Sequence, residues 1–209
     1  VKNGSDIAKA HLDGDDTTDP FSLMEGKTSC HTGWLKSAGM LMPMGYLIGN
    51  GYVTVAGDMN DTETLRTTIN HYFDGSKSGG NAASIPESGA LYSGYDGAVE
   101  CLSSGYGDVA FAKDSTVGSY CNNEVATDNA AWCLPMSDYV ALPKFGSSPS
   151  HAVMFNDAVL DDAKEVLIRD ALVAMKDDAD GLAILENVLG TSAMIATDAT
   201  THLGTYGAA

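Results

Sequence analysis

The spacing of apolar residues predicts short strands that alternate with helices. Strands are predicted at 26–31, 108–112, 139–142 and 151–155. The segment 108–112 is mostly apolar, as in strands buried within a parallel sheet. Helices are predicted at 34–48, 61–73, 95–102, 161–175 and 180–189. This alternation is typical of an α/β fold, here expected with a mixed sheet flanked by helices.

The remaining segments are rich in turn-forming residues. Residues 1–27 are predicted to form a short strand remnant and an acidic, turn-rich segment, and 74–90 a loop rich in glycine and serine. Residues 114–138 are predicted to form a polar loop. Pro43 interrupts the apolar stretch 34–48, so we expect the helix there to kink or restart.

The charge of the chain excludes several classes of function. The 209 residues include 11 Lys and Arg against 28 Asp and Glu, a formal net charge of −17. A phosphate backbone would be repelled, so we expect no nucleic-acid partner. A hydrophobic content of 44% is normal for a globular protein. Without an apolar run of about 18 residues we expect no membrane span.

The four cysteines, Cys30, Cys101, Cys121 and Cys133, have no C-x-x-C spacing, and their even number favours two disulfides in an oxidising compartment. Three pairings are available, and four buried thiols remain the alternative. Cys121 and Cys133 flank a short polar loop, which makes a local bridge between them plausible, with Cys30–Cys101 as the long-range bridge.

The segment 29–39 contains the residues of a candidate anion socket. A predicted strand is followed by Thr32, Lys36 and a helix start with small residues, Ala38 and Gly39. Backbone N–H groups at a helix start, a hydroxyl donor and an ammonium group together attract an anion. The alternative is a capped helix with a solvated lysine.

Two further residues are candidate metal ligands. Tyr95 opens a predicted helix and is either a half-buried anchor or a phenolate, which requires a strongly charged metal because the pKa of free tyrosine is about 10. His151 begins a predicted strand, where a histidine is usually structural. His31 is expected to pack within its strand.

These segments, in their order along the chain, resemble the transferrin family. The resemblance is carried by Gly26–Gly33, Ser37–Gly39, Pro43–Gly45, Tyr72–Ser76, Tyr92–Ala98, Cys101–Leu102, Gly107–Lys113, Pro149–Val153 and Leu203–Tyr206. The resemblance is strongest over about residues 20–155 and looser over the rest of the chain. It implies a lobe of the periplasmic-binding-protein type II-like fold, in which Fe³⁺ and carbonate are bound between two domains.

The resemblance assigns roles to individual residues. Tyr95 and His151 match metal ligands, and the four residues Thr32, Lys36, Ala38 and Gly39 match the anion-binding segment. Cys30–Cys101 matches a family disulfide, and Cys133 matches one member of another, for which Cys121 is the candidate partner. Fe³⁺ is a hard ion that prefers oxygen donors, in agreement with a phenolate and carbonate.

The chain also departs from the family pattern. Lys36 replaces the usual arginine and lacks its bidentate fork, so we expect looser anion geometry. Lys77 replaces a family cysteine. The family's aspartate and first tyrosine ligands are expected upstream of Val1, so we expect a fragment of a lobe or a trimmed product. The expected domains are 1–27, a remnant of the first domain; 28–150, the second, anion- and iron-binding domain; and 151–209, a hinge strand returning toward the first domain.

The resemblance implies carbonate-dependent ferric iron binding for uptake or transport, by an extracellular or cell-surface protein that is not an enzyme. A receptor or membrane anchor outside this chain is a further expected partner. The alternative is a metal-free oxyanion- or phosphonate-binding component of a transporter, which would use the same socket. A hydrolase is disfavoured because no G-x-S-x-G motif is present. A surface protein that has lost iron remains a further alternative.

Overall fold

A computed structural model of the chain describes residues 1–14, 18–58, 60–73, 83–86, 88–123, 125–148, 150–156 and 158–204. Most of the predicted loop at 74–90, with Lys77, lies outside these residues. The chain forms two compact units, residues 1–148 and residues 149–208.

The first unit is built on a three-stranded sheet in the order β2-β1-β3. The strands are β1 (Ser29–His31), β2 (Ala83–Ser84) and β3 (Val109–Phe111). Both pairings are parallel, and His31 at the end of β1 lies opposite Phe111 at the end of β3. Sequence analysis predicts a mixed sheet, whereas the sheet within the described residues is parallel.

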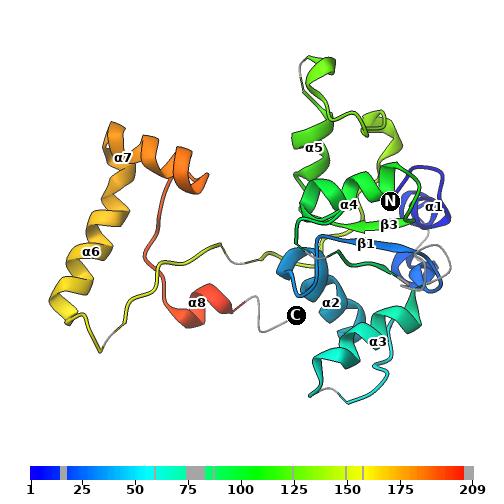
Figure 1. Ribbon diagram of the computed structural model, residues 1–209, viewed down its shortest axis with the longest axis horizontal. Helices are drawn as coiled ribbons and strands as arrows, with labels where there is room; N and C mark the ends of the chain where they lie inside the picture. Colours follow the sequence, from blue (N-terminus) through cyan, green and yellow to red (C-terminus); the bar gives the residue numbers. More distant parts are fainter. Residues whose placement is uncertain are drawn as a thin grey trace. The chain divides into compact units, whose positions relative to one another are not determined.

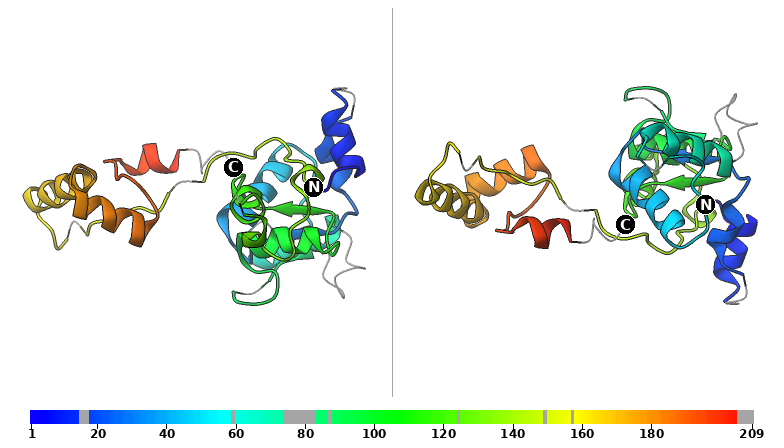
Figure 2. Two further views of the ribbon diagram at one scale, coloured as in Figure 1. Left: turned by 90° about the horizontal axis from the view of Figure 1, so that it is seen from above. Right: turned by 90° about the horizontal axis from the view of Figure 1, so that it is seen from below.

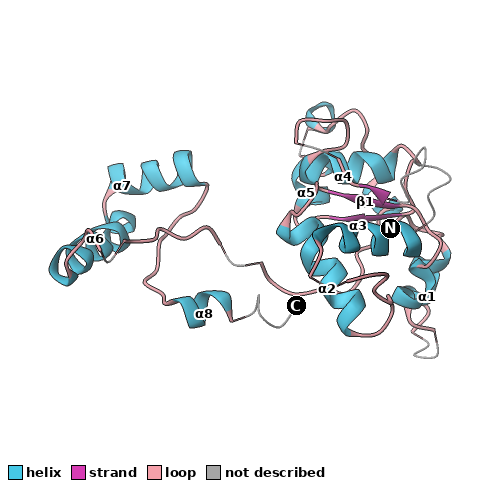
Figure 3. Ribbon diagram, turned by 60° about the horizontal axis from the view of Figure 1, so that its bottom comes forward, coloured by secondary structure: helices cyan, strands magenta, loops and turns pink. Residues whose placement is uncertain are grey.

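Helices cover both faces of this sheet, with α4 on one face and α2 and α3 on the other (Figures 1 and 3). Figure 2 shows the same layers from two further sides. The helical elements are α1 (Asp6–Leu12), η1 (Pro20–Met24), η2 (Ser37–Leu41), α2 (Met42–Gly49), α3 (Thr62–Tyr72), α4 (Gly94–Ser103), α5 (Thr116–Cys121), η3 (Ala126–Asp128) and η4 (Met136–Asp138). The α/β class predicted from the sequence is therefore correct for this unit.

The helix predicted at 34–48 begins later and in a different form. Residues 37–41 form a π-helical turn, η2, that continues directly into α2. The N–H groups of Met40 and Leu41 both donate to the carbonyl of Lys36, each at 3.0 Å. Pro43 is the second residue of α2 and the seventh of the continuous helix, so it removes an N–H that the preceding turn could otherwise accept.

The first residues of the chain pack into the core of this unit. Sequence analysis predicts a strand remnant there, but α1 forms because the Ser5 hydroxyl accepts the N–H of Ala8 at 3.1 Å and caps the helix. The core cluster consists of Val1, Ile7, Ala8, Phe21, Met24, Met40, Met44, Leu47, Val53, Ile69, Tyr72, Phe73, Val109 and Phe111. Residues from 1–27 thus share one core with the sheet.

The segments 139–142 and 151–155, both predicted as strands, are not strands in the described structure. In 139–142, Tyr139 forms only an isolated antiparallel bridge with Lys2, next to two hydrogen bonds between Val1 and Val140. The predicted strand 151–155 is irregular, and the described residues give it no ladder partner. Short apolar runs therefore predicted strands at places where the described residues provide no neighbouring strand.

The second unit contains α6 (Asp162–Ala174), η5 (Met175–Asp177), α7 (Ala179–Ile184), η6 (Leu185–Leu189) and α8 (Ala199–Leu203). The helices predicted at 161–175 and 180–189 are therefore confirmed. No residue of α6 is buried. Even Leu167, on the apolar face of this helix, is 70% exposed. None of the helices within the described residues has the length and apolar character needed to cross a bilayer.

Two disulfides are present, Cys30–Cys101 and Cys121–Cys133, and these are the pairs expected from the sequence. The first joins the centre of β1 to α4, and both of its cysteines are fully buried. Gly107 packs against it, since a Cβ added there would lie 2.2 Å from the Cys30 sulfur. The bond therefore fixes α4 against the sheet.

We predict that removing the long-range disulfide destabilises the fold more than removing the local one. The sequence separations are 71 and 12 residues, so loop-closure entropy predicts losses of about 4 and about 3 kcal/mol. Urea unfolding of the paired Cys30→Ala/Cys101→Ala and Cys121→Ala/Cys133→Ala variants measures the difference. A larger loss for the second pair would contradict the prediction.

Candidate anion and metal site

The predicted socket lies at the edge of the sheet where the parallel strands β1 and β3 both end. Thr32 follows β1 directly, and Ala112 and Lys113 follow β3. Ligands of α/β proteins gather at the carboxyl ends of parallel strands, where loops and helix N-termini meet. The residues singled out at 29–39 therefore occupy a position suited to binding.

Thr32 contributes a buried hydroxyl that has no hydrogen-bond partner. Its side chain belongs to a residue that is 5% exposed, and its Oγ1 is the one buried side-chain oxygen or nitrogen among the described residues that lacks a partner. An unsatisfied buried polar group costs about 1–3 kcal/mol. A polar ligand that accepts a hydrogen bond from this hydroxyl would remove that cost.

Gly39 lies directly against the Thr32 side chain. A Cβ added to Gly39 would lie 2.1 Å from the Thr32 Oγ1, so any larger residue would displace that hydroxyl. Ala38 and Gly39 belong to the first turn of the continuous helix formed by η2 and α2. The N–H groups of a first turn have no acceptor within the helix. The structure thus brings Thr32, Ala38 and Gly39 together.

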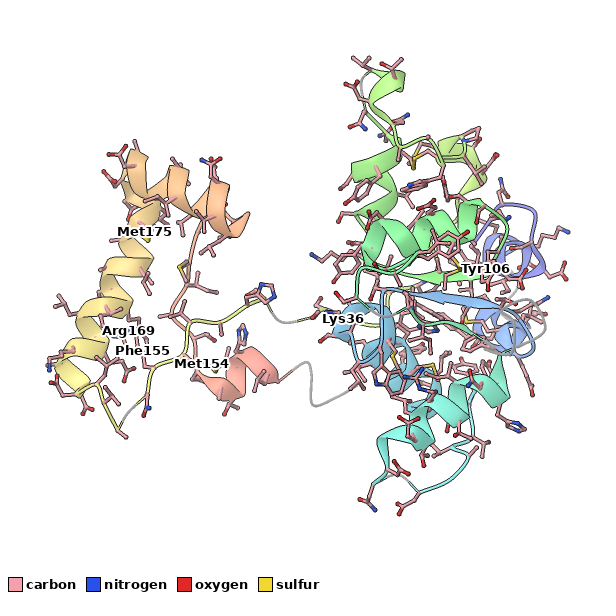
Figure 4. The ribbon with its side chains drawn as sticks, viewed as in Figure 1. Lys36, Tyr106, Met154, Phe155, Arg169 and Met175 are labelled. Carbon is pink, nitrogen blue, oxygen red and sulfur yellow. A yellow bond between two sulfur atoms is a disulfide. The ribbon has the colours of Figure 1, made fainter. Side chains whose placement is uncertain are left out.

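Lys36 precedes this helix and is exposed. Figure 4 shows it beside one end of β1. The preceding residue, Leu35, has a φ of 56°, a left-handed conformation that costs a non-glycine residue about 1–2 kcal/mol. The loop between Thr32 and Lys36 is therefore strained, as loops at functional sites often are.

Tyr95 is the second residue of α4 and is partly exposed. The residue before it, Gly94, donates its N–H to the carbonyl of Thr32 at 2.9 Å. The start of α4 is thereby attached to the socket. Lys113 was not singled out from the sequence as a site residue, yet its Nζ lies 4.8 Å from the centre of the Tyr95 ring. The parallel alignment of β1 and β3 is the signal that could have identified Lys113.

His151 belongs to the second unit, where it is exposed in an irregular segment. The preceding Ser150 carbonyl lies 2.8 Å from the Nε2 of His202 in the same unit. Tyr95 belongs to the first unit, so joint binding of one metal ion by Tyr95 and His151 stays a prediction. Within the described residues no cluster of three or more His, Cys, Asp or Glu side chains could hold a metal.

His31 packs inside the fold, as expected from the sequence. Its ring is completely buried and stacks on Phe111, with 5.0 Å between ring centres. Its Nδ1 lies 2.8 Å from the carbonyl oxygen of Gly39 and its Nε2 lies 2.9 Å from the Ser29 hydroxyl. Burial lowers the pKa of His31 from 6.5 to about 4, so the imidazole is neutral at neutral pH.

The first unit is thus an α/β domain that presents a buried hydroxyl, a helix N-terminus and a lysine at one sheet edge. The family model described as Transferrin matches residues 15–88 and 78–172. These matches cover more than half of the chain, which therefore belongs to the transferrin family.

Two relatives, human lactotransferrin and chicken ovotransferrin, agree with this assignment. Human lactotransferrin (Homo sapiens) is 30% identical over an alignment of 184 positions that covers 78% of this chain and 25% of that protein. Chicken ovotransferrin (Gallus gallus) is 35% identical over an alignment of 118 positions that covers 50% of this chain and 16% of that protein. Transferrin 1 from Manduca sexta is a solved structure with 21% identity and a TM-score of 0.47, covering 81% of this chain and 32% of that one. The chain spans about a quarter of human lactotransferrin.

We predict that Thr32→Val stabilises the ligand-free protein. Valine has nearly the shape of threonine and removes the unpartnered hydroxyl, so the free energy of unfolding should rise by about 1 kcal/mol or more. Thr32→Ser retains a hydroxyl and serves as the control. Urea unfolding in anion-poor buffer measures both variants. A loss of stability in Thr32→Val would show that the hydroxyl has a partner.

We also predict that His31 makes stability fall in acid. Its pKa is about 4 in the folded state and 6.5 when unfolded, so between these values the unfolded state binds more protons. The free energy of unfolding should therefore decrease as pH falls from 6.5 to 4, by up to about 3 kcal/mol. Comparing the pH profiles of the wild type and His31→Asn isolates this contribution from those of the carboxylates. Parallel profiles would contradict the prediction.

Proposed function

We propose that this chain binds ferric iron together with carbonate, as part of iron uptake or transport rather than catalysis. The observation that carries the proposal is the buried Thr32 hydroxyl without a partner, placed against Gly39 at a helix start. Carbonate is small and doubly charged, so it would accept hydrogen bonds from this hydroxyl and from the N–H groups of Ala38 and Gly39. The Lys36 ammonium would offset its charge.

Tyr95 and His151 are the proposed protein ligands of the iron. A phenolate is a hard oxygen donor that suits Fe³⁺, and the charge of the metal favours loss of the phenol proton. Carbonate would supply further oxygen donors to the ion. Because binding requires a deprotonated phenol and a neutral imidazole, acid should release the iron.

The proposed architecture is a part of a transferrin lobe of the periplasmic-binding-protein type II-like fold. Residues 28–150 would form its second, anion- and iron-binding domain. Residues 1–27 are proposed as a remnant of the first domain, and 151–209 as the segment that returns toward it. The whole lobe's activity belongs to this proposal, because the chain spans about a quarter of human lactotransferrin.

We infer an extracellular or cell-surface location. Two disulfides support an oxidising compartment. A receptor or a membrane anchor outside this chain would then connect iron binding to uptake.

We predict that adding Fe³⁺ produces a visible phenolate-to-iron charge-transfer band only when bicarbonate is present. Tyr95→Phe should abolish the band, because it removes the proposed oxygen ligand. Tyr106→Phe is the matched control, since Tyr106 is also partly buried but packs at a tilt against Tyr92, with 5.5 Å between ring centres. Thr32→Val should raise the bicarbonate concentration for half-saturation about tenfold or more, through loss of one hydrogen bond to an anion.

The same titrations separate iron binding from the metal-free alternative. Calorimetry with phosphate, a phosphonate and carbonate in the absence of iron measures anion binding alone. Tight phosphate binding without iron, or a band that is unchanged in Tyr95→Phe, would contradict the proposal.

A further inference from the structure

His31 is a hydrogen-bond donor to a backbone carbonyl beneath the socket. A carbonyl oxygen only accepts hydrogen bonds, so the Nδ1 that lies 2.8 Å from the Gly39 oxygen must carry the ring proton. Nε2 is then the acceptor of the Ser29 hydroxyl at 2.9 Å. The buried surroundings keep the ring neutral. The contacts therefore specify one tautomer of one neutral imidazole.

The reason why Gly39 needs this donor lies four residues further along the chain. In an α-helix the carbonyl of Gly39 would accept the N–H of residue 43. Residue 43 is a buried proline, which has no N–H. The π-helical turn at Ser37–Leu41 further alters the local hydrogen-bond register. His31 thus supplies from β1 a donor in place of the N–H that Pro43 lacks.

This donor acts on the residue that shapes the socket. Gly39 approaches Thr32 so closely that no Cβ fits between them. Thr32 follows His31 directly in the chain, and the ring of His31 is held by Phe111 of β3. A shift of the Gly39 peptide would therefore change the position of its own N–H relative to the Thr32 hydroxyl.

We propose that His31 is a positioning residue of the anion socket, which replaces the N–H missing at Pro43 and holds the Gly39 peptide against Thr32. The anion-binding part of this inference rests on the proposed function. The hydrogen-bond relay from Ser29 through His31 to Gly39 does not. Two sets of measurements therefore test it.

The first set requires no iron and no anion. Nitrogen NMR of the His31 ring in the whole chain should place the proton on Nδ1. In His31→Leu, hydrogen exchange of the N–H groups of Met40 and Leu41, which donate to the Lys36 carbonyl, should become at least about tenfold faster, because the loss of one hydrogen bond weakens the local structure. His31→Asn retains an amide donor at the Nδ1 position and should exchange like the wild type. A proton on Nε2, or unchanged exchange in His31→Leu, would overturn the relay.

The second set measures the bicarbonate concentration that half-saturates the iron charge-transfer band. His31→Leu should raise it about tenfold or more, whereas His31→Asn should leave it near the wild-type value. The double variant His31→Leu/Pro43→Ala restores an N–H at residue 43 and should recover much of the loss. Pro43→Ala alone, which keeps His31, should change little.

The outcomes separate the two proposals. A wild type without a bicarbonate-dependent band contradicts the proposed function, and the first set then decides the relay. If the same bicarbonate concentration half-saturates the band in wild type and His31→Leu, and only the urea midpoint of unfolding changes, His31 has a merely structural role. That result would overturn the inference. The inference is also overturned if the double variant His31→Leu/Pro43→Ala binds bicarbonate no better than His31→Leu. If His31→Leu does not fold, Ser29→Ala takes its place: it removes the hydroxyl at Nε2, while the Gly39 carbonyl still requires the ring proton on Nδ1. A ring proton on Nε2 in that variant would overturn the relay.

Discussion

The parallel pairing of β1 with β3 is the interaction on which the rest of the site depends. It places the ends of both strands at one edge, so that Thr32 and Lys113 leave the sheet on the same side. The Cys30–Cys101 bond then holds α4 on this sheet, and the Thr32 carbonyl accepts the N–H at the start of that helix. The Thr32 hydroxyl and the start of α4, which carries Tyr95, are therefore positioned from a single short strand.

The socket combines features that destabilise the protein in isolation. A hydroxyl is buried without a partner, and Leu35 adopts a left-handed conformation in the adjoining loop. A glycine is required where a helix would otherwise favour a larger residue. Such features persist when the surrounding structure imposes them. The disulfide, the stacked His31 ring and the core beneath the sheet provide that support.

Much of this arrangement could be predicted from the sequence, because the apolar spacing and the small residues at 37–39 are local signals. Strands β1 and β3 and helices α3, α4 and α6 lie close to their predicted positions. What could not be predicted depends on partners distant in sequence. The segment 139–142 is a short apolar run, but its neighbour is the short N-terminal segment beginning at Val1. Helix α5 lies in a stretch that is polar enough to resemble a loop.

The site shows the same division between local and distant signals. Thr32, Ala38 and Gly39 could be chosen from residue type and spacing alone. The contribution of Lys113 required the strand alignment, and the link between His31 and Pro43 required the register of a π-helical turn, which periodicity does not reveal. Joint binding by Tyr95 and His151 stays a prediction.

The strand order β2-β1-β3 also has a consequence for the time course of folding. β1 lies in the middle of the sheet, yet both of its neighbours are synthesised later, and the residue opposite His31 is Phe111. Pairings between residues so far apart form slowly, because the intervening chain must first be ordered. During translation the Cys30 thiol therefore stays exposed and unpaired until α4, which carries Cys101, has been synthesised. Chaperones and thiol oxidants that act in that interval would determine what fraction of the molecules reaches the native state.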